Sequence, residues 1–164
     1  MANTYTQLYI HFVFAVKFGA AQLNNEWDDR LRLYITAIVQ NNGHKMLAIN
    51  NMQDHVHMFI GLNTTQSVSD IMRLVKGDSS EWINKEKLTP ARFQWQDGYG
   101  AFSYSKPQID KVVKYINNQQ EHHKKFNFLD EYKQLLTSFD IEFNEQEGQL
   151  LTEQRDCCFF STKR

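Results

Sequence analysis

The segment "NMQDHVHMFIGL", residues 51–62, combines a turn signal with a strand whose side chains alternate in character. Successive side chains of a strand point to opposite faces of a sheet. The face that we expect to pack in the core carries Val56, Met58, Ile60 and Leu62, and the opposite face carries His55, His57 and Phe59. The preceding residues 44–52 also have a strand pattern, so the two segments are predicted to form a hairpin joined near "NMQD".

The segments around this hairpin extend the pattern to a whole fold. The expected elements are a strand at residues 5–16, a helix at 24–43, a second helix at 66–86 and a strand or bent hairpin at 93–105. Asn24 or Asn25 is expected to cap the first of these helices. The order strand, helix, strand, strand, helix, strand predicts an α+β fold, the ferredoxin-like split βαβ arrangement built on an antiparallel sheet.

Two further helices are predicted behind this unit, at residues 107–125 and 128–139. The chain of 164 residues with 41% apolar content is long enough for one domain with a real core. We therefore expect one domain at residues 1–140 and, because the rest is polar and loosely patterned, a C-terminal appendage at residues 141–164.

Composition narrows the classes of protein. The sequence has no apolar run near the roughly 20 residues needed to cross a bilayer, and its start lacks the pattern of a signal peptide, so a cytoplasmic protein without membrane contact is expected. The adjacent Cys157 and Cys158 are expected to be reduced thiols. A net charge of −1 counts mildly against a nucleic-acid partner, although lysines gather between residues 106 and 125.

Two groups of polar residues suggest chemistry. His55 and His57 lie on one strand face with Cα atoms about 6–7 Å apart, so their rings could converge on one metal ion. In the predicted helix 107–125, Tyr115 and Gln119 are four residues apart and share a face, with Lys111 one turn before and His122 two turns after Tyr115. Taken singly, each group also fits an ordinary polar sheet face or a solvated helix.

Three motifs in the right order carry a resemblance that the separate groups do not. They are "HVH" at 55–57, "WQDGYGAFSYS" at 95–105 and "YINNQQEHH" at 115–123. Over about residues 5–130 the sequence resembles the single-tyrosine transposases of the IS200/IS605 type and the REP-associated tyrosine transposases, which belong to the HUH endonuclease superfamily. The resemblance implies a catalytic helix packed on the sheet face opposite the other helices, and an activity in DNA transposition.

The resemblance also implies roles for particular residues. Tyr115 corresponds to a nucleophile that attacks single-stranded DNA and forms a 5′-phosphotyrosine link. His55, His57 and Gln119 correspond to ligands of a divalent ion, and two imidazoles with an amide oxygen favour Mg²⁺ or Mn²⁺. A side chain of Asn50, Asn51 or Asp54 is expected to orient the histidines.

Departures from the pattern concern DNA binding. The family commonly has a basic "KYRR"-like segment after the first strand, whereas this chain has "KFGA", and Asn63 stands where a proline often follows the histidine strand. The residues expected to contact phosphates are Lys17, Lys76 and Lys111. The expected partner is single-stranded DNA with hairpin ends.

A homodimer is the expected assembly. The aromatic strand at residues 5–14 is predicted to be an exposed sheet edge, which is a template for pairing. Residues 100–106 are predicted to be a linker that could carry Tyr115 to the histidines of a second subunit, because Gly98 and Gly100 allow a bend there.

Other functions stay open at this stage. A replication-initiator nickase of the same superfamily also places its tyrosine after the histidines. A non-catalytic nucleic-acid-binding module is possible on a ferredoxin-like sheet rich in aromatics, although the RNP1 pattern of RNA-recognition domains is absent. A metal hydrolase with its H-x-H on a barrel strand would need about 250 residues.

Overall fold

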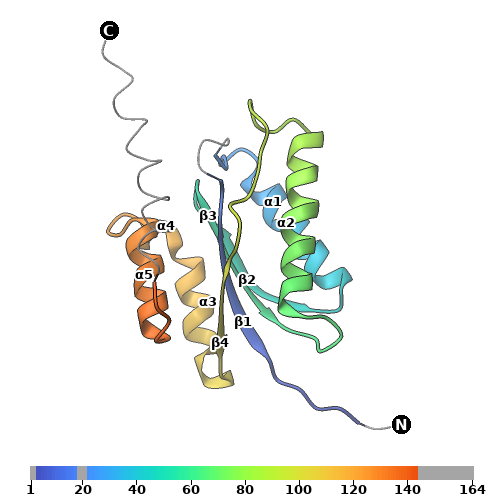
Figure 1. Ribbon diagram of the computed structural model, residues 1–164, viewed down its shortest axis with the longest axis vertical. Helices are drawn as coiled ribbons and strands as arrows, with labels where there is room; N and C mark the ends of the chain where they lie inside the picture. Colours follow the sequence, from blue (N-terminus) through green and yellow to red (C-terminus); the bar gives the residue numbers. More distant parts are fainter. Residues whose placement is uncertain (1–2, 18–21, 144–164) are drawn as a thin grey trace.

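The computed structural model describes residues 3–17 and 22–143. Its elements, shown in Figure 1, are β1 (Tyr9–Ala15), α1 (Asp28–Asn41), β2 (Lys45–Asn51), β3 (His55–Gly61), α2 (Val68–Lys85), β4 (Gly100–Tyr104), the 3₁₀ turn η1 (Lys106–Gln108), α3 (Ile109–Asn117), α4 (Gln119–His122) and α5 (Phe128–Ser138). The strands form one antiparallel sheet in the order β2-β3-β1-β4. This is the predicted α+β, ferredoxin-like arrangement, which is thereby confirmed.

The predicted hairpin forms as expected. β2 and β3 pair antiparallel, with Asn50 opposite His57, and the Met52 backbone N–H donates to the His55 carbonyl at 2.9 Å to close the turn. A register shift interrupts the pairing between Met46 and Ala48. The turn therefore fixes His55 at the first position of β3.

The helices α1 and α2 cover one face of the sheet (Figure 1). The apolar side chains of β3 on this face, Val56, Met58 and Ile60, share a fully buried core with residues of both helices. A capping box at Ser67 and Asp70 starts α2. Helix α1 begins instead at Asp28 without a side-chain cap, so the expected cap by Asn24 or Asn25 was wrong; Asn24 forms a turn that accepts from the Glu26 N–H.

The first strand lies inside the sheet and not at its edge. β1 pairs with β3 on one side and with β4 on the other, so the predicted exposed edge at residues 5–14 was wrong. Local pattern identifies a strand, but strand order depends on where the later β4 pairs. The edges of the sheet are β2 and β4.

Residues 93–105 contain one strand and no hairpin. Trp95 makes an isolated bridge to Val16, and Gly100–Tyr104 then pair with β1 as β4. The expected linker at residues 100–106 was therefore wrong, because β4 occupies most of it. The chain turns directly from β4 into η1 and α3.

The single helix predicted at residues 107–125 is divided into η1, α3 and α4. Asn118 leaves helical geometry between α3 and α4, with φ −96° and ψ 18°. From β2, the Asn50 side-chain amide donates to the Ile116 carbonyl at 2.9 Å, which satisfies a carbonyl at the end of α3. A long-range contact thus accompanies the end of this helix.

The helices α3, α4 and α5 lie on the other side of the sheet from α1 and α2 (Figure 1). Helix α5 is close to its predicted position, and Asn127 caps it by accepting from the Asp130 N–H. Most of the predicted appendage, with Cys157 and Cys158, falls outside the described residues. Among the helices that the structure describes, none has the length and apolar character to cross a membrane.

Candidate metal centre and tyrosine site

The two histidines of β3 point away from the apolar core, as their alternation predicted. Both side chains are fully buried beneath α3–α5. Their Nε2 atoms lie 3.5 Å (His55) and 3.4 Å (His57) from the Glu131 Oε2 atom. None of these three atoms has a hydrogen-bond partner, although all are buried. Buried polar atoms normally have a partner, so three unpartnered ones that converge are suited to a metal ion.

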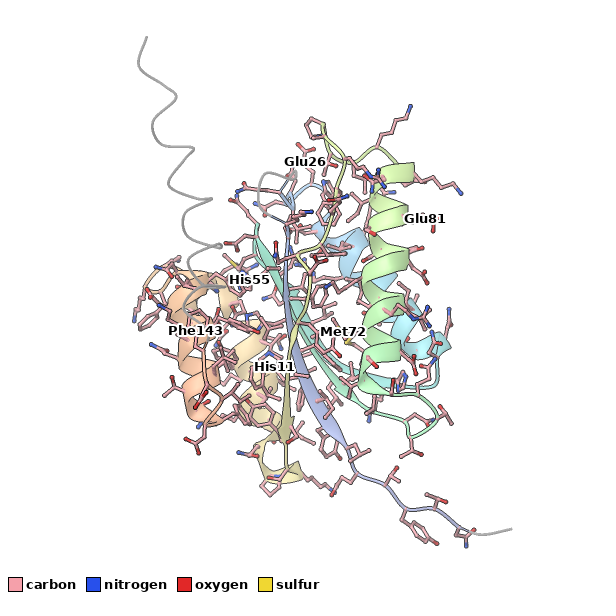
Figure 2. The ribbon with its side chains drawn as sticks, viewed as in Figure 1. His11, Glu26, His55, Met72, Glu81 and Phe143 are labelled. Atoms are coloured by element: carbon pink, nitrogen blue, oxygen red, sulfur yellow. The ribbon has the colours of Figure 1, made fainter. Side chains whose placement is uncertain are left out.

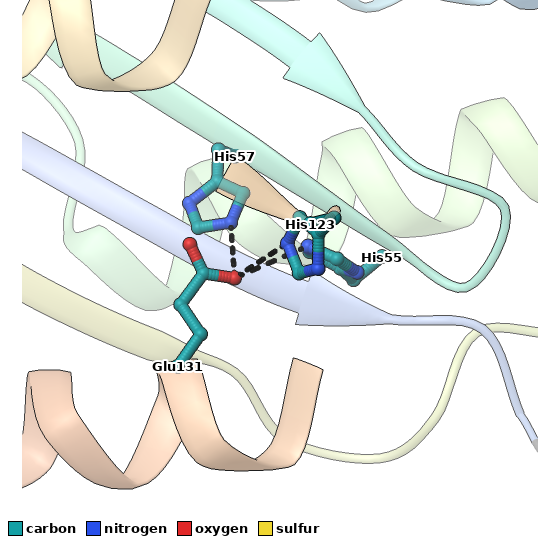
Figure 3. Close-up of side chains that lie close together, drawn as sticks. All are labelled: His55, His57, His123 and Glu131. Atoms are coloured by element: carbon teal, nitrogen blue, oxygen red, sulfur yellow. Dashed lines mark ion pairs between the residues drawn. The ribbon is translucent and has the colours of Figure 1, made fainter. Parts of the chain in front are cut away.

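His123 adds a third imidazole to this cluster. Its Nε2 atom lies 2.8 Å from Glu131 Oε2, and one ligand atom from each of His55, His57, His123 and Glu131 lies within 4.8 Å of the others. Figure 3 shows the Glu131 carboxylate from α5 facing the three rings. The cluster could hold a metal ion.

A second layer of contacts orients the two strand histidines. Asp54 Oδ1 lies 2.6 Å from His55 Nδ1, as expected for one of the three residues considered for this role. Asn50 and Asn51 contact Arg32. On the other ring, His57 Nδ1 lies 2.9 Å from Nε2 of His11, a buried residue of β1. When Nδ1 of each ring carries the proton of its contact, each Nε2 lone pair is available for a metal.

Tyr115 of α3 reaches the same cluster within one chain. Its hydroxyl donates to Glu131 Oε1, and its ring lies 5.8 Å from the His57 ring, measured between centroids. Gln119 is fully buried; its Nε2 donates to Glu131 Oε1 at 3.0 Å, and its Oε1 lies 3.0 Å from His123 Nε2. The structure therefore brings together the four residues that the sequence indicated for catalysis and metal binding, namely Tyr115, His55, His57 and Gln119.

Burial and the Glu131 carboxylate set the protonation of the site. Burial lowers the pKa of His57 to about 4, so this ring is neutral near pH 7. Burial also acts to lower the pKa of His55, but the hydrogen bond to Asp54 and the nearby Glu131 carboxylate outweigh it and raise the pKa. Burial acts to raise the pKa of Glu131, yet contacts with the histidines hold that pKa far below its usual range.

The tyrosine hydroxyl is held in its protonated form. Burial, and then the hydrogen bond to the charged Glu131, raise the pKa of Tyr115 above its ordinary value. A phenolate is the stronger nucleophile. Any attack by Tyr115 therefore needs a positive charge nearby, which an ion bound by the histidines would supply.

Aromatic packing holds helix α5 against the sheet over the site. The Phe128 ring stacks on His55 with centroids 4.1 Å apart, and Phe139 packs on Phe102 of β4 at 4.9 Å. A Cβ atom at Gly100 would lie only 3.0 Å from the Tyr132 ring, so the absent side chain lets α5 approach β4. These contacts place the Glu131 carboxylate.

The three lysines expected to contact DNA lie in different settings. Lys111 is exposed on α3, and exposed Lys17 lines a groove of about 890 Å³ that also includes Lys76, Arg92 and Trp95. The Lys76 ammonium donates to the carbonyls of Gln96 and Gly98 at 2.7 and 2.8 Å, and burial lowers its pKa. Lys76 thus holds the loop at Gln96 and Gly98 in place. The groove that it lines does not include the histidine cluster.

A smaller groove reaches the cluster from outside. It has a volume of about 310 Å³, and its lining includes Asp54, Gln120 and His123. His123 therefore lies between this groove and the buried histidines. The groove is a candidate path for an ion or a phosphate.

His11, His123 and Glu131 were not identified from the sequence. His11 shares a strand face with Tyr9 and Val13, so alternation could have assigned it to a face, but its place beside His57 depends on the pairing of β1 with β3. Glu131 follows Phe128 by three residues and precedes Leu135 by four, which puts a carboxylate on the apolar stripe of α5. The sequence contains no such signal for His123. The helix is interrupted at Asn118, and this change of direction points His123, and not His122, toward the ligand cluster.

The antiparallel sheet, the buried histidine pair and the nearby tyrosine agree with the transposase domain that the sequence motifs resemble. A comparison with family profiles agrees: the profile described as "Transposase IS200 like" matches residues 4–119, so the chain belongs to this family. The match ends at Gln119, the first residue of α4, and does not include α5.

Individual relatives support the same placement. The ISDra2 transposase TnpA of Deinococcus radiodurans is 27% identical over 121 residues, which cover 70% of this chain and 86% of the relative. A crystal structure of a Deinococcus radiodurans R1 protein described as a transposase has a TM-score of 0.57 at 22% identity, covering 73% of this chain and 95% of that one. A REP-associated tyrosine transposase bound to a REP hairpin has a TM-score of 0.56 at 16% identity, covering 75% of this chain and 73% of that one. These two likenesses establish the shared fold.

Proposed function

We propose that this protein is a transposase that cleaves and rejoins single-stranded DNA by metal-dependent transesterification, with Tyr115 as the nucleophile. One observation carries the proposal: the Tyr115 hydroxyl lies beside a buried cluster in which the unpartnered Nε2 atoms of His55 and His57 converge. Membership of the IS200-like transposases gives this geometry its context.

The chemistry exchanges one phosphodiester for another. The Tyr115 oxygen attacks a DNA phosphorus, the bond from phosphorus to the 3′-oxygen breaks, and a 5′-phosphotyrosine link forms. The phenol loses its proton, and the departing 3′-oxygen gains one. The link preserves the bond energy, so a later 3′-hydroxyl can reverse the attack and join strands without ATP.

His55 and His57 would hold a divalent ion, for which we propose Mg²⁺ or Mn²⁺, with an oxygen ligand from the helices α3–α5. The site fits a divalent ion because its unpartnered buried atoms, two imidazole nitrogens and a carboxylate oxygen, are of types that bind metals. When bound, the ion supplies positive charge that polarises the phosphate and stabilises the leaving 3′-oxygen. Asp54 and His11 keep the two rings oriented.

The proposed substrate is single-stranded DNA with hairpin ends. A REP-associated tyrosine transposase of the same fold is bound to a REP hairpin in its structure, which supports this choice. Lys17 and Lys111 are the exposed cations proposed to contact phosphates, and Lys76 contributes from the wall of the same groove as Lys17.

We also propose a cytoplasmic homodimer. With β1 inside the sheet, pairing through a sheet edge would use β2 or β4. The tyrosine and the histidines of one chain already meet, so each subunit would have its own site in this arrangement.

The test is the covalent adduct. The protein is incubated with labelled single-stranded DNA from the flanks of its own gene, with Mn²⁺ or with EDTA, and the products are separated under denaturing conditions. We expect an adduct only with metal, and none with Tyr115→Phe, which removes one hydroxyl. Tyr34→Phe is the matched control, because Tyr34 stacks on Trp82 on the other side of the sheet. An adduct of full yield from Tyr115→Phe would refute the assignment.

A second series tests the metal. His55→Ala and His57→Ala should each abolish cleavage, since each removes a nitrogen of the cluster. Cleavage that persists in EDTA would refute metal dependence.

A further inference from the structure

We propose that Glu131 of α5, and not Gln119 of α3, provides the oxygen ligand of the metal, and that His123 joins it as a third imidazole. Gln119 is then a positioning residue that holds both. This inference rests on the metal-dependent site of the proposed function and specifies its ligands. It assigns a metal-binding role to a helix beyond the part of the chain that the family profile matches.

The distances favour the carboxylate. Glu131 Oε2 lies 2.8 Å from His123 Nε2 and within 3.5 Å of the Nε2 atoms of His55 and His57. An ion among these nitrogens would be adjacent to this oxygen. Oε2 has no hydrogen-bond partner, whereas the other carboxylate oxygen already accepts from Tyr115 and Gln119.

Both ends of the Gln119 amide are engaged elsewhere. Its NH₂ group donates to Glu131, and its oxygen faces His123 Nε2 at 3.0 Å. The carboxylate needs a donor, so the amide cannot be turned around without setting two oxygens against each other. In this orientation Gln119 holds Glu131 by a hydrogen bond, and its oxygen can accept from His123 only while His123 Nε2 carries a proton, which a bound ion would replace. Holding a ligand in place is the role of a residue behind the ligands.

The charges point the same way. Glu131 is a carboxylate with a side chain only 2% exposed, and among the described residues its ion-pair partners are histidines: His55, His57, His122 and His123. A buried carboxylate without a permanent cation is costly unless it is paired. A divalent ion would pair it, and the carboxylate would offset charge that two neutral imidazoles and an amide cannot.

This ligand set changes the preferred metal. Three imidazoles and one carboxylate favour first-row transition ions such as Mn²⁺, Co²⁺ or Zn²⁺ over Mg²⁺, which prefers oxygen ligands. It also connects the ion to α5. Because the Glu131 carboxylate touches Tyr115 as well, the nucleophile and the ion would share one side chain.

The deciding experiment measures Mn²⁺ affinity by calorimetry and by electron paramagnetic resonance, without DNA. We expect Glu131→Gln, which keeps the shape of the side chain, to weaken Mn²⁺ binding more than about 100-fold, beyond the 10–100-fold typical of residues behind the ligands. Gln119→Ala should weaken it about 10-fold. Asp130→Asn is the matched control, since it removes one negative charge from the exposed side of the same helix and should leave the affinity unchanged.

Equal or greater loss with Gln119→Ala than with Glu131→Gln would overturn the inference. Circular dichroism reports whether each variant folds. If Glu131→Gln does not fold, hydrogen exchange of the unaltered protein decides: Mn²⁺ should slow exchange in α5, and unchanged exchange there, with slower exchange in β3, would overturn the inference.

The two proposals fail separately. A Glu131→Gln protein with normal Mn²⁺ affinity and a normal Tyr115 adduct would refute only the ligand assignment. Tight Mn²⁺ binding that needs Glu131, without any DNA adduct, would refute the proposed function and leave the metal site in place.

Discussion

The two faces of β3 are buried equally but by different means. On the face covered by α1 and α2, Met58 and its neighbours pack among apolar side chains of both helices. On the face covered by α3–α5, His55 and His57 are also fully buried, yet each has a polar partner on one ring nitrogen and none on the other. Figure 2 labels Met72 on the first side and His11 and His55 toward the second.

The contrast shows what burial alone does not determine. An apolar face is stable with any well-packed apolar cover, because the hydrophobic effect is non-directional. A face of imidazoles needs cover that supplies particular atoms at particular places. The first face should therefore govern stability and the second face metal binding, which substitutions on one strand can separate.

The largest expected effects, on stability and on Mn²⁺ binding, come from replacing one residue on each face by alanine. Met58→Ala should lower the free energy of unfolding by about 2–5 kcal/mol, because it leaves a cavity in the α1–α2 core. The Mn²⁺ affinity of the folded protein should stay unchanged. His57→Ala should abolish Mn²⁺ binding with a smaller loss of stability. Urea unfolding and Mn²⁺ titration measure both; a Met58→Ala protein that folds but binds no metal would contradict the separation.

The next test loosens the cover of the histidine face. Gly100→Ala would bring a Cβ atom to 2.9 Å from the Phe102 ring and 3.0 Å from the Tyr132 ring. We expect a loss of about 1–3 kcal/mol in the free energy of unfolding, as for overpacked cores, and faster hydrogen exchange in α5. Gly77→Ala on α2 is the control, since nothing lies within 4 Å, and it should gain about 0.5–1 kcal/mol. Equal effects at the two glycines would argue against the close α5 contact.

The histidine face should also make stability depend on pH. Burial lowers the pKa values of His11, His57 and His123, so each contributes stability above its unfolded pKa of about 6.5 that is lost as pH falls toward the folded value, about 4 for His57. His55, whose pKa is raised by Asp54 and Glu131 against its burial, contributes in the opposite sense. We expect the three lowered pKa values to have a larger combined effect on stability than the one raised pKa.

The metal-free protein should therefore become less stable between pH 7 and pH 5, by up to about 1.4 kcal/mol per pH unit for each net proton bound on unfolding. Urea unfolding in EDTA at several pH values measures this, and His57→Gln should flatten the dependence. A rise in stability on acidification would show that His55 dominates.

The smallest expected effect concerns orientation. His11→Phe keeps a ring stacked beside His57 but removes the nitrogen that His57 Nδ1 faces. Mn²⁺ affinity should fall about 10-fold, the lower end for residues behind metal ligands. His44→Phe is the control, because His44 is buried against Gln66 and Asn63. Identical affinities for the two variants would remove His11 from the site.

The sequence predicted most of the fold because its strands and helices have clear periodicity. The face of β3 that carries His55 and His57 followed from alternation alone. Strand order did not follow, because the place of β1 depends on where β4 pairs. The end of α3 at Asn117 could not be predicted either, since the Asn50 side chain that bonds the Ile116 carbonyl there is distant in sequence.

Only part of the site was predicted, because some of its residues lie in sequence motifs and others are brought together only by folding. Tyr115 and Gln119 stood in a motif, and the structure brings both to the histidines. Glu131 stood in no motif, because its partners come from β3, α3 and the segment after α4, and only folding collects them. Motifs report residues that are near in sequence, whereas a ligand cluster depends on nearness in space.

The position of α5 has a consequence for synthesis on the ribosome. The four strands and Tyr115 precede α5 in the chain, so they emerge while the histidine face still lacks its carboxylate. At about 5–20 residues per second, the interval between Tyr115 and Glu131 lasts on the order of a second or more. Tyr115 of the nascent transposase is therefore synthesised before Glu131, the residue that binds its hydroxyl. The hydrogen bond between them forms only as α5, the last described helix, leaves the exit tunnel.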